Sequence, residues 1–120
     1  MKNLILSGLI LVFFASCSTQ KQVAATDNKP LKEVIAQPDV VLVDVRIPEQ
    51  YKEATAKNAV NIPLAEIEKN MDFFKKQKKV VVFCNKGVQA SKAFEILKKN
   101  GVNVVNGNTW KEVKEIQDQK

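Results

Sequence analysis

One of the two cysteines, Cys84, stands where a thiol could do chemistry. It follows an apolar run of β-branched and aromatic residues at 80–83 and precedes a polar loop with one glycine, Gly87. An amphipathic helical pattern begins after the loop, so the segment is predicted to be a strand, a loop and a helix. Backbone N–H groups converge at a helix N-terminus, where they stabilise a thiolate and attract anions. The pattern favours a reactive thiol. Without its neighbours, Cys84 could instead be a buried core cysteine at a strand end, which is the alternative.

The residues after Cys84 favour the reactive thiol. Asn85, Lys86, Gly87 and Gln89 would make a poor core but a suitable cradle for an anion. Glycine at position 87 permits a turn with positive φ that a side chain resists. Lys86 would meet the incoming anion, or else be a solvated loop lysine. We therefore expect Cys84 to be catalytic and the substrate-binding residues to be Asn85, Lys86, Gly87, Val88 and Gln89.

The chain contains no histidine. His-assisted serine or cysteine hydrolysis is excluded, because the base that activates the nucleophile is missing. Two cysteines without histidine also give none of the usual zinc-ligand spacings, so we expect no metal and no cofactor. The chemistry must come from the cysteine itself.

Length and composition indicate one globular domain. The chain has 120 residues, of which 45% are hydrophobic and 27% charged, which is ordinary for a folded protein. Nineteen Lys and Arg against thirteen Asp and Glu give a net charge of +6. These positive charges are spread along the chain, which predicts a general attraction to anions and no nucleic-acid groove.

The N-terminus is predicted to be a targeting segment. Lys2 precedes an apolar run at 4–14, which is shorter than the roughly 20 residues that span a bilayer. Small residues then precede Cys17, so residues 1–16 resemble a bacterial lipoprotein signal and Cys17 would carry lipid such as palmitate. Ser18 then favours the periplasmic side of the outer membrane within the cell envelope. An ordinary secretory signal with a spare thiol and an uncleaved anchor are the alternatives.

The rest of the chain reads as a polar tether at 17–29 and a folded domain at 30–120. The apolar run at 40–45 is typical of a strand buried on both faces of a parallel sheet. Gly101 is predicted to close a helix, and Asn108 or Thr109 to cap the next one. Alternating strands and helices predict an α/β domain, a small mostly parallel sheet flanked by helices. The expected elements are helices at 31–36, 48–54, 63–70 and 90–99, strands at 40–45, 58–63, 80–83 and 102–105, a turn at 106–108 and a final helix from about 109.

Several motifs together resemble those of a single-domain rhodanese, over roughly residues 31–120. They are Val43-Asp44-Val45-Arg46, Pro48-Glu49 with Tyr51, Asn58-Ala59-Val60-Asn61-Ile62-Pro63, Val81-Val82-Phe83-Cys84, the Cys-x-x-Gly loop and Ala90-Ser91-Lys92-Ala93. The resemblance implies a sulfurtransferase in which Cys84 takes sulfane sulfur as a persulfide from a small anionic donor such as thiosulfate. The acceptor would be a thiol or a cyanide-like nucleophile. It also implies that Asp44 and Arg46 are structural residues near the site.

Two departures from the rhodanese pattern bear on activity. Residues 54–56 lack the histidine that members often carry, and Asn85 and Gln89 stand where many have arginine. Backbone N–H groups and the flexible Lys86 would then hold the anion in place of an arginine fork, which predicts weaker capture. A catalytically weak binding or sulfur-carrier module is therefore the alternative function. A cysteine phosphatase would need arginine at Ala90, which argues against that class. We expect a monomer.

Overall fold

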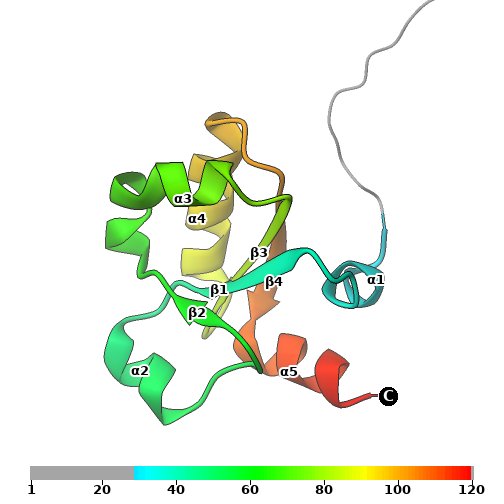
Figure 1. Ribbon diagram of the computed structural model, residues 1–120. Coiled ribbons are helices and arrows are strands. Elements are labelled where there is room, and N and C mark those ends of the chain that lie inside the picture. Colours follow the sequence, from blue (N-terminus) through cyan, green and yellow to red (C-terminus); the bar gives the residue numbers. More distant parts are fainter. Residues whose placement is uncertain (1–28, 120) are drawn as a thin grey trace, which may run out of the picture.

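The computed structural model describes residues 29–119, which form a four-stranded sheet between two sets of helices (Figure 1). All the strand pairs are parallel and the strand order is β2-β1-β3-β4. The predicted α/β class, with a parallel sheet flanked by helices, is confirmed. The strands are β1 (Val40–Asp44), β2 (Val60–Asn61), β3 (Lys79–Cys84) and β4 (Val104–Thr109).

Helices cover both faces of the sheet. Helices α3 and α4 lie on one face, and α1 and α5 lie on the other (Figure 1). The helices are α1 (Leu31–Ile35), α2 (Pro48–Glu53), α3 (Met71–Lys75), α4 (Val88–Lys99) and α5 (Trp110–Asp118), with short 3₁₀ helices η1 (Leu64–Glu66) and η2 (Glu68–Asn70).

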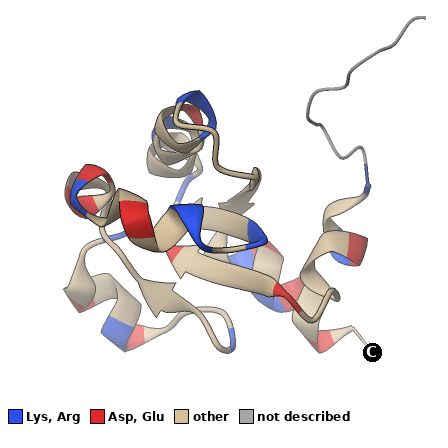
Figure 2. Cartoon of the chain, turned by 45° about the horizontal axis from the view of Figure 1, so that its top comes forward, with Lys and Arg blue, Asp and Glu red and all other residues tan. Residues whose placement is uncertain are grey.

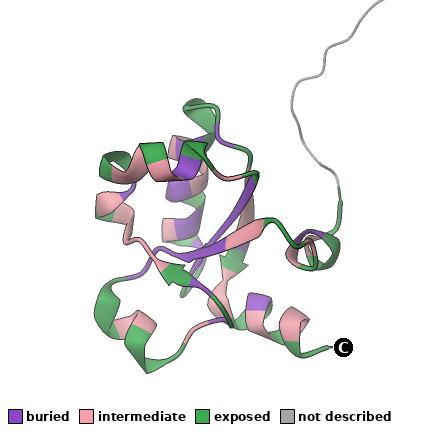
Figure 3. Cartoon of the chain, viewed as in Figure 1, coloured by how far each residue is buried: buried purple, intermediate pink, exposed green. Residues whose placement is uncertain are grey.

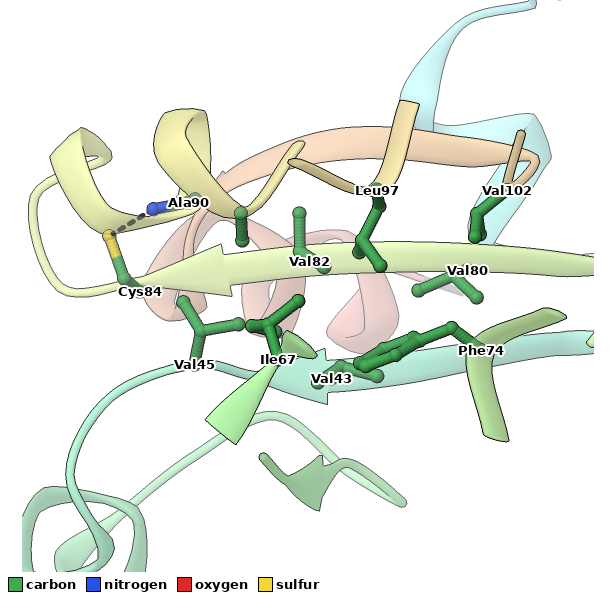
Figure 4. Packing of buried hydrophobic residues seen from close by; sticks show 11 residues of the cluster. Val43, Val45, Ile67, Phe74, Val80, Val82, Cys84, Ala90, Leu97 and Val102 are labelled. Atoms are coloured by element: carbon green, nitrogen blue, oxygen red, sulfur yellow. Dashed lines mark hydrogen bonds between the residues drawn. The ribbon is translucent and has the colours of Figure 1, made fainter. Parts of the chain in front are cut away.

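Strand β3 is buried along its whole length, as Figure 3 shows for the centre of the sheet. Successive side chains of a strand point to opposite faces, so β3 contributes to two separate cores. Val80 and Val82 join Cys84 in the cluster under α3 and α4 (Figure 4), while Val81 and Phe83 pack toward α1 and α5. Cys84 therefore ends the central strand on the face that α4 covers.

A glycine with positive φ lies next to each end of α4. Gly87 (φ +92°) precedes the first residue of α4, which begins two residues earlier than predicted, and Gly101 (φ +82°) follows its end. The N–H groups of Gly101 and Val102 donate to the carbonyls of Lys98 and Leu97 at 3.0 Å, as in a left-handed helix cap. The predicted closure at Gly101 is confirmed.

The prediction of one helix at 63–70 is wrong. The segment forms η1 and η2, and the α-helix α3 follows at 71–75. Asn70 separates η2 from α3: its φ is −107°, and its side-chain Nδ2 donates to the carbonyl of Glu66 at 2.8 Å. Such local side-chain bonds compete with a regular helical ladder. The buried side chains of Ile67 and Phe74 fix the segment on the sheet.

The predicted strand at 102–105 and turn at 106–108 are also misplaced, because β4 runs from Val104 through Thr109. Val102 belongs to the cap of α4, which delays the strand. The turn-like residues lie within the strand because β4 carries one extra residue there, Gly107, in a β-bulge opposite Val82 and Phe83. A Cβ on Gly107 would lie 2.7 Å from Cγ1 of Val81, so only glycine fits this approach without displacing its neighbours.

Asn108 and Thr109 are the two N-caps that the sequence predicts for α5, and in the structure Thr109 is the N-cap. Its Oγ1 accepts a hydrogen bond from the N–H of Glu112 at 3.1 Å, and it donates to Oε2 of Glu112 at 2.9 Å. This reciprocal pair resembles a capping box and fixes the direction in which α5 leaves the sheet.

Positively and negatively charged residues are both spread over the described elements (Figure 2). The predicted signal at 1–16, Cys17 and residues 18–28 of the predicted tether lie outside the described residues. Within residues 29–119, no helix has the length and apolar character to cross a bilayer.

Candidate active site

Cys84 lies at the carboxyl end of β3, between the ends of β1 and β4. Its register partner on β4 is Thr109, and the preceding residue, Phe83, pairs with Asp44 of β1. Parallel strands bring their carboxyl ends to one edge of a sheet, which is the usual place for a site in α/β proteins. The residue is 1% exposed and is a free thiol.

The sulfur of Cys84 accepts two backbone hydrogen bonds. The N–H of Gly87 donates to Sγ at 3.0 Å and that of Ala90 at 3.3 Å, and Figure 4 shows the second bond. The sulfur thus lies at the N-terminus of α4, where the helix dipole contributes about half a positive elementary charge. N–H donors together with this dipole stabilise negative charge on the sulfur.

Gly87 gives the loop this shape. Its positive φ turns the chain back over the sulfur, and its carbonyl accepts the N–H of Ser91 at 3.0 Å to start α4. The residue is buried, and a Cβ there would lie 2.2 Å from Oδ1 of Asn108. The turn predicted at this glycine is confirmed.

The structure places the five residues predicted to bind substrate at different depths around Cys84. Asn85, Lys86 and Val88 are exposed, Gln89 is half-buried and Gly87 is buried. Among residues 29–119, the ammonium of Lys86 has no ion-pair partner. It is therefore the charged group of the loop that is available to an incoming anion.

Asp44 and Arg46, expected to be structural, are engaged with the segment between α2 and β2. Both are buried, at 0% and 4% exposure, and Nη2 of Arg46 lies 2.7 Å from Oδ2 of Asp44. Thr55 Oγ1 donates to the same carboxylate at 2.7 Å, and Arg46 Nη2 donates to the carbonyl of Ala54 at 2.6 Å. The pair ties the end of β1 to the following loop.

Three further side chains support this edge of the sheet. Asn61 Nδ2 donates to the carbonyls of Asp44 and Arg46, both at 2.9 Å. Trp110 packs under the Arg46 guanidinium, 5.1 Å from the ring centroid, and the hydroxyl of Tyr51 donates to the carbonyl of Ala59 at 2.7 Å. Trp110 and Tyr51 thus both contribute to packing, on the α1 and α5 face.

Sequence reasoning missed Thr55, Asn61 and Asn108. Thr55 and Asn61 form hydrogen bonds to the Asp44 and Arg46 pair, whereas Asn108 lies against the Cys84 loop itself. A single polar residue carries no periodic signal, whether it lies in a loop like Thr55 or at a strand end like Asn61 and Asn108, so only the three-dimensional arrangement identifies its partners. Within residues 29–119, His, Cys, Asp and Glu form no cluster of three or more suited to hold a metal ion.

The site therefore defines an α/β protein with a buried thiol at the carboxyl end of a central strand. Backbone N–H groups of the following loop and helix donate to this thiol. The model of the rhodanese-like domain matches residues 27–109. The chain therefore belongs to the rhodanese-like domain family.

Known proteins similar to the chain include an enzyme of Escherichia coli, the thiosulfate sulfurtransferase PspE, which is 38% identical over 59% of this chain and 71% of its own length. A tRNA uridine(34) hydroxylase of Acinetobacter baylyi is 33% identical over 66% of this chain, but the chain spans only 27% of that protein. Among solved structures, a rhodanese with anions from E. coli superimposes with a TM-score of 0.56 at 37% identity, covering 61% of this chain and 89% of that one.

Proposed function

We propose that the protein is a sulfurtransferase of the rhodanese type, with Cys84 as the residue that carries sulfur. The observation that supports this role most directly is the pair of N–H groups of Gly87 and Ala90 that donate to the Cys84 sulfur. Membership of the family and the likeness to a thiosulfate sulfurtransferase add to it.

In the first step of this proposal, the thiolate of Cys84 attacks the outer sulfur of a donor such as thiosulfate. A new S–S bond forms on Cys84, the S–S bond of the donor breaks, and sulfite leaves with the electron pair. The single negative charge moves from Sγ to the terminal sulfur of the persulfide. An acceptor thiolate or cyanide then attacks that terminal sulfur and restores the Cys84 thiolate.

The loop suits this chemistry because the Cys84 side chain carries one negative charge both as the thiolate and as the persulfide. The N–H donors of Gly87 and Ala90 and the N-terminus of α4 stabilise that charge before and after transfer, so no general base is required. Lys86 offers a flexible cation to the donor, and Asn85 and Gln89 offer neutral amides. Because an arginine fork would bind an oxyanion more strongly, we expect a high KM for thiosulfate.

The experiment that tests this function measures the mass of the purified full-length chain after incubation with thiosulfate. We expect a gain of one sulfur atom, located on Cys84 by peptide mapping and removed by cyanide or a thiol. A chain in which Cys84 stays unmodified at high thiosulfate concentration would instead support a binding module that has lost turnover, the alternative that the missing loop arginines suggest.

We further propose that the protein is lipid-anchored in a bacterial cell envelope, on the periplasmic side of the outer membrane. The support is the order of Lys2, the apolar run at 4–14 and the small residues before Cys17, followed by Ser18. A single acyl chain gives only marginal membrane binding, whereas several chains anchor stably. Lipid on Cys17 would leave Cys84 as the remaining thiol of the mature chain, so the two cysteines could not pair.

Fractionation of cells that express the wild type or Cys17→Ala tests the anchor. We expect the wild type to stay with membranes through salt washing and to incorporate labelled palmitate, because several acyl chains hold it there. The Cys17→Ala variant should incorporate no label. A soluble, unlabelled wild type would contradict both the anchor and the location.

A further inference from the structure

Asn108 lies near the carboxyl end of β4, on the same edge of the sheet as Cys84, and contacts the loop at Gly87. The carboxamide covers the Cα of Gly87: Oδ1 would be 2.2 Å, and Cγ 3.3 Å, from a Cβ built on that glycine. Gly87 in turn donates its N–H to the Cys84 sulfur at 3.0 Å. The Asn108 side chain therefore fills the space beside the Cα of Gly87, on the side where a Cβ would lie.

The orientation of this carboxamide is fixed by helix α5. Asn108 Nδ2 donates to Oε2 of Glu112 at 2.5 Å, and that oxygen also accepts the hydroxyl of Thr109 at 2.9 Å. A flipped amide would place Oδ1 against the carboxylate, so the network requires Oδ1 to face Gly87. The N-terminal cap of α5 thus holds the group that contacts the loop.

The backbone of β4 is shaped to present Asn108. The bulge at Gly107 shifts the pairing so that Asn108 lies opposite Phe83, beside Cys84. Its φ is +69°, a conformation that asparagine tolerates better than most residues. Asn106 supports the same corner: its Oδ1 accepts the N–H of Asn108 at 2.8 Å, and its Nδ2 donates to Ser91 of α4 at 3.2 Å.

From this geometry we propose that Asn108 is a positioning residue for the Cys84 loop. It holds Gly87 in place from outside, so that the N–H groups of Gly87 and Ala90 stay directed at the sulfur. Its kinetic consequence rests on the proposed sulfur transfer, but its effect on the loop does not. The residue acts through Gly87 and forms no bond with Cys84.

Asn108→Gly tests the role, because glycine keeps the positive φ and removes the carboxamide. The matched control is Asn58→Gly, since Asn58 (φ +64°) is the other non-glycine residue with positive φ in residues 29–119. Amide hydrogen exchange in the full-length chain, purified in detergent, reports the loop directly. We expect the protection of the Gly87 and Ala90 amides to fall about tenfold in Asn108→Gly, as for the loss of one supporting contact, and to be unchanged in Asn58→Gly.

Steady-state kinetics separate loop positioning from a loss of folded protein. Partial unfolding lowers kcat alone, because fewer molecules are active, whereas a displaced loop binds the donor less well. We expect the thiosulfate KM of Asn108→Gly to rise several-fold above that of Asn58→Gly. Equal KM values together with equal amide protection in the two variants would overturn the proposal.

A second comparison tests the contact itself. Gly87→Ala should lower the melting temperature more than Gly101→Ala, because both glycines have positive φ but only a Cβ at position 87 meets another atom within 4 Å. In the Asn108→Gly background, Gly87→Ala should cost no more than Gly101→Ala does. A Gly87→Ala penalty that is the same in both backgrounds would contradict the contact. If the wild type takes up no sulfur, the proposed function fails, while amide exchange and this comparison still decide the role of Asn108.

Discussion

The variant Cys84→Ser is expected to lose sulfur transfer completely and to keep its fold. In the proposed mechanism the thiolate is both the nucleophile and the group on which sulfur is carried, and a serine hydroxyl is neither ionised nor able to form a stable equivalent of a persulfide. We expect the rate to fall by at least about a thousandfold, as for the removal of other essential nucleophiles. Transfer from thiosulfate to cyanide measures the loss.

The fold should tolerate this change because serine nearly preserves the shape of the site. Its hydroxyl can accept the N–H groups of Gly87 and Ala90 that now donate to sulfur at 3.0 and 3.3 Å. We expect the free energy of unfolding to change by about 1 kcal/mol or less, the scale of one exchanged hydrogen bond. Urea unfolding and circular dichroism measure it.

Cys17→Ser serves as the control, because it removes the other cysteine of the chain. In detergent it should transfer sulfur at the rate of the wild type. If Cys84→Ser keeps most of its activity, or if activity is lost only in Cys17→Ser, sulfur is not carried on Cys84.

The surroundings of Cys84 could be predicted because strong local signals coincide there. An apolar run, a glycine and a helical repeat each specify one element, and the elements are adjacent in the sequence. The structure agrees with them: β3 ends at Cys84, Gly87 has positive φ and α4 follows. The parallel sheet could be predicted for a similar reason, because continuous apolar strands alternate with helical segments.

Regions where a particular contact overrides the general preference of the segment could not be predicted. Residues 106–108 have the composition of a turn, yet they form part of β4, because the bulge at Gly107 lets this strand pack closely on Val81. Residues 63–70 form two short 3₁₀ helices in place of one α-helix, and a side-chain bond from Asn70 to Glu66 lies at the end of the second. In both cases the deciding interaction is a polar side chain or a close approach that periodicity does not encode.

The same limit applies to the support of the site. The family motif predicts that Asp44 and Arg46 are structural, but nothing in the sequence identifies Thr55 and Asn61 as their partners. For Asn108 the sequence predicts only the role of a helix cap, which Thr109 fills. The sequence therefore predicts Cys84 as the candidate reacting group, whereas the side chains that support its surroundings are identified only from the three-dimensional arrangement.

Asp44→Ala is expected to produce the largest loss of stability among single changes near the site. The Asp44 carboxylate is fully buried and accepts bonds from the backbone N–H, Nε and Nη2 of Arg46 and from Thr55. Its removal leaves the Arg46 guanidinium buried, at 4% exposure, with the Ala54 carbonyl as its remaining hydrogen-bond partner. Breaking a buried pair in this way typically costs about 3–5 kcal/mol.

Urea unfolding of wild type and Asp44→Ala measures this loss, and Asp39→Ala is the matched control. Asp39 also pairs with a cation, Lys78, but at 3.5 Å and with 60% of its side chain exposed. An exposed pair contributes little, so the control should lose less than about 1 kcal/mol. Removing both charges in Asp44→Ala/Arg46→Ala should recover part of the loss, because no unpaired charge then stays buried.

Activity distinguishes this structural role from a catalytic one. Because the polar atoms of Asp44 and Arg46 bond to each other and to residues 54–61, the folded fraction of Asp44→Ala should keep the thiosulfate KM of the wild type under conditions where it is stable. A loss of stability below about 1 kcal/mol would show that the buried pair contributes no more than an exposed one. A raised KM in fully folded Asp44→Ala would instead place the carboxylate in the machinery that binds the donor.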